Sequence, residues 1–181
     1  MGAEFGARSM ELCDVELTDI INSMLNLKSA GALIGSYTIK VTDARTGALK
    51  RVIGPIKNLI VASSGYGTDL VTRALGGDTT YQLEIDSAAI GSGSTAPTAA
   101  DTGLGTSVLA GIAVASVDYP TTGQVILSFF IPDGDLANGT YNEFGIFANL
   151  RLFARSLITP AFTKGSNENT TVDYTITLTA S

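Results

Sequence analysis

Three groups of residues in this sequence have the types that chemistry would need. The first is Gly91-Ser92-Gly93-Ser94-Thr95, which has the glycine and hydroxyl content of a phosphate-binding loop. A working loop of that kind has a lysine before its Ser or Thr and leads into a helix. The lysine is missing here, so the stretch is predicted to be a turn.

The second group is Asp133-Gly134-Asp135, followed by Asn138 and Glu143, which offers the oxygen ligands that calcium prefers. Its spacing does not fit an EF-hand loop, because the required glycine and the closing glutamate are not at their places. A solvated loop is predicted. A weak calcium site near Asp133 and Asp135 stays open as the alternative.

The third group is a set of carboxylates, Glu84, Asp86 and Asp118, two of which would suffice for glycoside hydrolysis. The sequence has no tryptophan to line a sugar subsite. It also has no histidine, and Cys13 is its only cysteine, which excludes Ser-His-Asp and Cys-His catalysis and zinc sites of the Cys/His kind. We therefore expect no catalytic, metal-binding or cofactor-binding residue, and a protein that is not an enzyme.

Glu143 is the most informative single charge. It lies in Asn142-Glu143-Phe144-Gly145-Ile146-Phe147, where its neighbours are expected to be buried. A buried carboxylate needs a partner, and Arg151, Arg155 and Lys164 follow on the adjoining strands. We predict a structural ion pair from Glu143 to one of them, with Arg155 preferred. An exposed Glu143 is the alternative.

The overall composition limits the function classes further. The chain of 181 residues is long enough for one domain with a proper core. Its net charge of −6 and its scattered Lys and Arg argue against nucleic-acid binding. No apolar run is long enough to cross a membrane, and the N-terminus has no convincing signal peptide. We expect a protein made in the cytoplasm, without membrane insertion.

Two regions are expected from the hydrophobic pattern. Residues 1–31 form an N-terminal arm and an amphipathic helix that starts at Asp14 and stops at Gly31, with Ile20 and Leu25 on its apolar face. This helix packs either on its own domain or on a neighbouring subunit. Residues 32–181 form the second region, a β-sandwich domain.

Alternating apolar residues and turn signals predict the strands of the second region. A β-hairpin is expected over residues 36–43 and 49–53, with 57–61 as its extension, and a short helix over 68–75 with Thr68 as its N-cap. Further strands are expected at 85–91, 108–117, 124–131, 141–147, 150–158 and 171–179. The predicted class is mainly β: an antiparallel β-sandwich with one N-terminal and one short internal helix.

The glycine-rich stretch after residue 90 connects two of these strands. Gly91 and Gly93 end a strand, Pro97 stiffens the loop, and Asp101 can accept hydrogen bonds from its own backbone. Together with Leu104, these residues are our candidates for structural or intersubunit contacts.

The order of motifs from about Ile56 to the C-terminus resembles a family of phage tail and baseplate-associated proteins. The resemblance rests on an opening Asn-Leu-Ile-Val with a following short helix, a strand ending in Gly-x-Gly, a Thr-Ala-Pro loop, Asp-Thr-x-Leu, Glu-x-Gly-Ile-Phe, an Leu-Phe-Ala-Arg strand and a late lysine. These are Asn58–Val61, Gly91–Gly93, Thr95–Pro97, Asp101–Leu104, Glu143–Phe147, Leu152–Arg155 and Lys164. The N-terminal helix and the small residues of 108–117 depart from the pattern.

The resemblance implies a virion structural protein with no catalytic residues, located in the phage particle. We expect it to form a homo-oligomer, a trimer first and a hexamer second, and to contact other tail or baseplate proteins. A receptor- or glycan-binding module at a fibre tip, which would use Tyr66, Tyr81, Tyr119 or Tyr141, is one alternative. A capsid decoration protein and a depolymerase fragment are the others.

Overall fold

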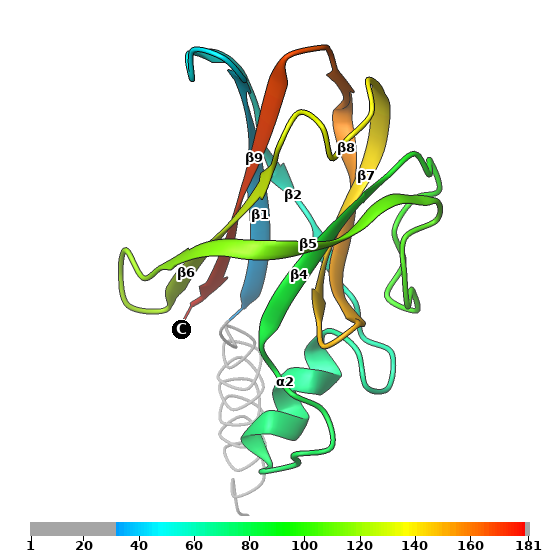
Figure 1. Cartoon of the computed structure of the whole chain (residues 1–181). Coiled ribbons are helices and arrows are strands. Elements are labelled where there is room, and N and C mark those ends of the chain that lie inside the picture. Colours follow the sequence, from blue (N-terminus) through cyan, green and yellow to red (C-terminus); the bar gives the residue numbers. More distant parts are fainter. Residues whose placement is uncertain (1–31, 180–181) are drawn as a thin grey trace, which may run out of the picture. The chain divides into compact units, whose positions relative to one another are not determined.

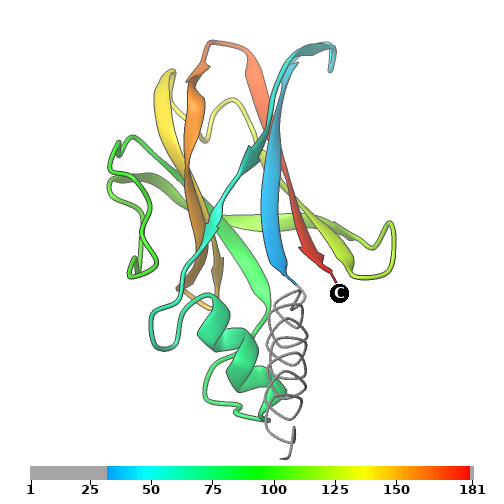
Figure 2. The same ribbon diagram turned by 180° about the vertical axis from the view of Figure 1, so that it is seen from behind.

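A computed structural model describes residues 32–179, of which Leu33–Leu178 form one compact unit (Figures 1 and 2). The predicted N-terminal arm and helix, with Ile20 and Leu25, lie outside the described residues. In the described part the chain is mainly β and antiparallel with one short helix, which confirms that much of the predicted fold class.

The elements follow one another along the chain as antiparallel strands with one helical interruption. They are β1 Leu33–Asp43, β2 Leu49–Lys57, β3 Leu59–Ile60, α2 Thr68–Leu75, β4 Ile85–Gly91, β5 Ser107–Asp118, β6 Gln124–Ile131, β7 Gly139–Ala148, β8 Arg151–Lys164 and β9 Glu168–Leu178. None of the helices in this part of the chain is long and apolar enough to cross a membrane.

All these strands belong to one sheet with the order β2-β1-β9-β6-β5-β4-β7-β8-β3. The sheet bends back on itself and nearly closes. We call β2, β1, β9 and β6 its first half and β4, β7, β8 and β3 its second half. Figure 1 shows β5 running across the molecule, with β6 at one end and β4 at the other.

β5 joins the two halves because it changes partner along its length. Its first part pairs with β4, from Ser107 to Ala113, and its last part pairs with β6, from Val114 to Asp118. The register shifts on both sides of the change, and Gly111 has a φ of +71°. Such bulges bend a strand and increase its twist, which lets one strand serve both halves.

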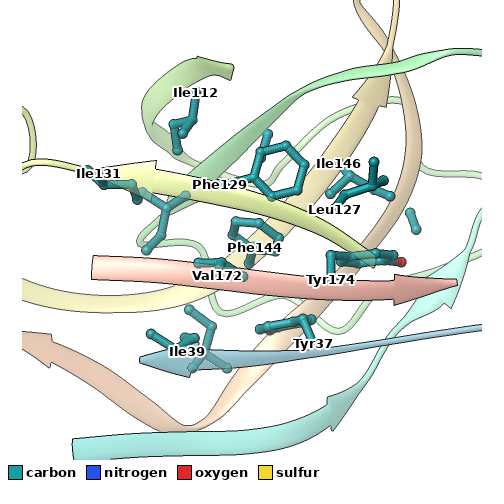
Figure 3. Packing of buried hydrophobic residues seen from close by; sticks show 14 of the residues in the cluster. Tyr37, Ile39, Ile112, Leu127, Phe129, Ile131, Phe144, Ile146, Val172 and Tyr174 are labelled. Atoms are coloured by element: carbon teal, nitrogen blue, oxygen red, sulfur yellow. The ribbon is translucent and has the colours of Figure 1, made fainter. Parts of the chain in front are cut away.

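The core lies between the two halves and is centred on aromatic rings (Figure 3). Tyr37 on β1 contacts Phe144 on β7 with ring centroids 4.9 Å apart, and it stacks on Tyr174 of β9 at 6.1 Å. Phe129 on β6 meets Phe144 edge to face at 6.1 Å. Side chains along each strand point alternately inward and outward, and these residues occupy inward positions, as expected for strands with one buried face.

The short helix forms where the sequence predicts it, but its N-cap differs. Gly67 precedes the helix with a φ of +48°, and a Cβ there would lie 1.9 Å from the Val61 carbonyl oxygen. Thr68 is therefore the first helical residue and not the cap, and its hydroxyl donates to Val61 O at 3.4 Å. The turn needs a glycine at residue 67, and this requirement decides the boundary.

Several strand predictions need correction, since β1, β2 and β9 also start or end beyond their predicted bounds. The segment 57–61 extends the hairpin only at its start: Lys57 ends β2 and pairs with Ser36, whereas Leu59 and Ile60 form β3 and pair with β8. β7 and β8 are longer than predicted, since Gly139 and Thr140 pair with Lys164 and Thr163. The proline at residue 160 interrupts the alternation in the sequence, yet the pairing of β8 resumes beyond it.

Candidate functional site

The candidates from Gly91 to Leu104 meet Glu143 and Arg155 at one place, on the outer side of β7 and β8. Phe144 and Ile146 of β7 point into the core, so Glu143, which directly precedes Phe144, points to the opposite face of the sheet. The loop between β4 and β5 covers this face. We call Glu143, Arg155 and Asp101 the buried charge cluster.

Glu143 forms the centre of this cluster and is completely buried. One carboxylate oxygen, Oε1, accepts the backbone N–H of Gly93 at 3.0 Å and of Thr106 at 2.7 Å. The other, Oε2, accepts Gly105 N–H at 2.9 Å and lies 3.1 Å from Arg155 Nη2. Both carboxylate oxygens accept backbone N–H groups of the loop, so Glu143 binds the loop to the sheet.

Arg155 extends the cluster to the middle of the loop. Its Nη1 donates to Asp101 Oδ2 at 2.8 Å and its Nη2 donates to the Thr95 carbonyl at 2.8 Å. Its side chain is only 4% exposed, and its Nε has no hydrogen-bond partner among residues 32–179. The predicted ion pair of Glu143 with Arg155 is confirmed.

Asp101 closes the loop on itself, as predicted, and also binds the arginine. It accepts the backbone N–H of Thr98 at 2.9 Å and the Thr98 hydroxyl at 2.7 Å. Partial burial raises the pKa of Asp101, but the bonds from Thr98 and the charge of Arg155 outweigh it and lower the pKa below its ordinary value. The ion pair with Arg155 was not predicted, because it joins positions far apart in the sequence.

The glycines of the Gly-x-Gly motif are needed for space. A Cβ on Gly91 would lie 2.3 Å from the Thr106 carbonyl oxygen, and one on Gly93 would lie 2.2 Å from Glu143 Oε1. Leu104 Cδ2 packs against Gly145, where a Cβ would be 2.9 Å away. Pro97 is half-buried in the loop. The sequence candidates from Gly91 to Leu104 are thus all part of one packed unit with Glu143.

The same geometry rules out the resemblance to a phosphate loop. The strand ending at Gly91 leads into an irregular loop and not into a helix. The amide of Gly93, which a phosphate would need, donates to the chain's own carboxylate. An internal anion occupies the position that an external one would take.

Lys164 lies in a second cluster and not beside Glu143. Its Nζ donates to Asp133 Oδ1 at 2.7 Å and, more weakly, to Asn138 Oδ1 at 3.4 Å. The bond from Lys164, followed by one from the Glu168 amide, lowers the pKa of Asp133. Nearby, Arg51 of β2 binds both carboxylate oxygens of Glu168, at 2.9 and 2.8 Å.

The alternative of a weak calcium site near Asp133 and Asp135 depends on which carboxylates of this region are free to bind an ion. Asp133 is paired with a lysine ammonium, Glu143 belongs to the other cluster, and Asp135 is exposed. Among the described residues no group of three or more His, Cys, Asp and Glu has the arrangement of a metal site. Asp133 therefore serves to satisfy Lys164.

Within the part of the chain that the structure describes, the three carboxylates considered for hydrolysis share no hydrogen-bond partner. Glu84 is exposed before β4, Asp86 accepts the Asn149 amide, and Asp118 accepts the amide of the next residue. A hollow of about 350 Å³ beside α2 includes none of them. Its one charged residue, Asp78, is paired with Arg73 at 2.9 Å.

The tyrosines considered for glycan binding are mostly engaged. Arg151 stacks on Tyr81 at 3.9 Å from the ring centroid and on Tyr66 at 5.3 Å. Tyr141 is buried and donates to the Ala137 carbonyl at 2.6 Å. Tyr119 is the one of the four with a largely exposed side chain, at 75%. The stacking of Arg151 had no signal in the sequence.

Comparison with known proteins finds no matching family model, no similar curated protein and no similar solved structure.

Proposed function

We propose that this protein is a non-enzymatic structural component of a bacteriophage particle, a tail-fibre or baseplate building block that assembles with itself and with neighbouring virion proteins. In this proposal the two halves of the sheet act as the layers of a β-sandwich. The expected assembly is a homo-oligomer, a trimer or a hexamer.

One observation carries the proposal. The motifs on which the phage resemblance rests lie far apart in the sequence, yet Gly93, Asp101, Glu143 and Arg155 meet in the buried charge cluster. Their polar groups are used to hold a long loop on a sheet. Residues that work as a scaffold in this way support a building block better than an enzyme, whose polar groups must be free to meet a substrate.

A glycan-binding role at a fibre tip is the second candidate, and the exposed Tyr119 is the observation that favours it. It lies in the turn between β5 and β6. A Tyr119→Ala variant that loses binding on a glycan array would support this role over the first. Capsid decoration differs from the main proposal only in the position on the particle.

Two measurements test the proposal. Light scattering on the full-length protein, with and without residues 1–31, should give a defined oligomer that the truncation weakens. Antibodies against the protein should label tails in electron micrographs of phage particles from the source culture. A monomer at all concentrations, with no labelling of particles, would refute a building-block role, and labelling of heads would indicate decoration.

A further inference from the structure

β5 has an open edge where it parts from β6. The pairing between these strands ends at Val114 and Phe129. Within residues 32–179, Phe130 and Ile131 beyond this point pair only with β9, and the segment Ser107–Ala113 pairs only with β4. Two strand edges with unpaired backbone groups therefore diverge from each other, as the view in Figure 1 shows.

A hollow of about 160 Å³ lies between these edges. It is lined by Leu109–Ala113 on one side, by Phe130 and Ile131 on the other, and by Asp135 at its end. Side chains of the described residues thus leave this edge uncovered. An uncovered edge is a template for pairing with another strand.

The edge strand β2 has charged and proline residues that protect it against such pairing, whereas the open edge of β5 has none. The edge strand β2 contains Lys50, Arg51, Pro55 and Lys57. Lysine and proline on an edge are the usual means of preventing strand addition. β5, by contrast, has neither a charged residue nor a proline from Ser107 to Val117.

The side chains around this edge suit contact with a second protein chain. Val108 is 51% exposed and Phe130 is 46% exposed, so both present apolar surface to solvent beside this edge. Ala110 and Ala113 are small and exposed, so another backbone can approach closely. Two copies with a net charge of −6 repel each other in general, and an uncharged segment is where they can meet.

We propose that residues 107–113 of β5 pair antiparallel with the same segment of a second copy of this chain. The contact is isologous: each Val108 packs near the other copy's β5, and the two sheets join edge to edge through backbone hydrogen bonds. This inference deepens the proposed assembly function and rests on it, since it names the contact that the assembly uses.

An isologous contact joins copies in pairs, so it limits the size of the assembly. It is compatible with a hexamer, in which two trimeric rings or three dimers meet, and with a simple dimer. It is not compatible with a lone trimer. Of the two sizes expected above, the proposal therefore selects the hexamer.

The test uses light scattering on the full-length protein and a Val108→Lys variant, which places a charge beside the open edge. Loss of the isologous contact should halve the mass of the assembly. The matched control is Thr175→Lys on β9, a strand whose Thr175 pairs with Ser36 on one side and Ile126 on the other. The control should keep the full mass, and circular dichroism should show that both variants fold.

Hydrogen exchange on the wild-type protein gives a second measurement that needs no variant. Amides within 107–113 should exchange more slowly in the assembly than in the diluted, dissociated protein. An assembly that persists in Val108→Lys, with fast exchange in 107–113, would overturn the β5 contact and leave the assembly function standing. A wild-type monomer at all concentrations would overturn both.

Discussion

The substitution Glu143→Gln tests whether the buried charge cluster stabilises the fold. It keeps the shape of the side chain and removes its charge. Each carboxylate oxygen meets two donors, Gly93 and Thr106 at Oε1, and Gly105 and Arg155 at Oε2. The NH₂ group of the new glutamine must replace one of these two oxygens. In either orientation it places N–H donors against two donors of the protein, so the hydrogen bonds at that position are lost.

The magnitude follows from what the new side chain loses. A buried donor left unpaired costs about 1–3 kcal/mol, and removing one partner of a buried ion pair costs about 3–5 kcal/mol. Arg155 keeps its bonds to Asp101 and Thr95, which favours the lower end. We expect the free energy of unfolding to fall by about 3 kcal/mol, less than the total stability of a typical domain.

Urea unfolding at pH 7 and fixed protein concentration measures this change. Glu84→Gln is the matched control, because Glu84 is exposed and should change stability by less than about 0.5 kcal/mol. A double-mutant cycle with Arg155→Gln should give a coupling energy within about 0.5–3 kcal/mol. A loss in Glu143→Gln no larger than that of the control would refute the structural role of the cluster.

Three further predictions concern other parts of the fold. Gly93→Ala should lower stability by about 1–3 kcal/mol, because its Cβ would overlap a buried carboxylate oxygen. The control Gly103→Ala should not lower stability, because its Cβ meets nothing within 4 Å. Thermal melts of the two variants make the comparison. Hydrogen bonds from two turn amides and then from a lysine lower the pKa of Asp43 to about 2. The contribution of Asp43 to folding stability is therefore present above its ordinary pKa and is lost as the pH falls from about 4 to 2. Asp43→Asn should flatten the acid-unfolding curve in that window, and an unchanged curve would contradict this. Tyr37→Phe should cost about 1 kcal/mol in urea unfolding, because it leaves the serine hydroxyl that Tyr37 contacts at 2.8 Å unpaired in the core.

The predictable parts of this structure are those in which neighbouring residues determine the outcome. β6 has the predicted bounds because its apolar run ends at a turn on one side and at Pro132 on the other. The ion pair of Glu143 and Arg155 was predictable because a charge inside an apolar strand needs a partner on the next strand, and β7 and β8 form a hairpin in which Gly145 pairs with Arg155.

The parts that the sequence did not indicate depend on contacts between distant segments. β3 has two residues, too few to show which strand it joins. Asp101 and Arg155 are separated by more than fifty positions, and the pairing of Lys164 with Asp133 requires the loop before β7 to fold back on β8. The bend of β5 leaves little trace in the sequence, since Ala, Gly and Val fit either a straight or a bent strand.

The distribution of charge connects the fold to the proposed assembly. The charges inside the two clusters satisfy one another, which leaves them little capacity to bind a partner. The longest segment without charge or proline protection is β5, at the point where the sheet is open. An uncharged open edge in a soluble monomer would promote uncontrolled aggregation, so its presence is best explained if the edge is covered in the assembled protein. The bend that leaves β5 unpaired would then serve the assembly and not only the closure of the sheet.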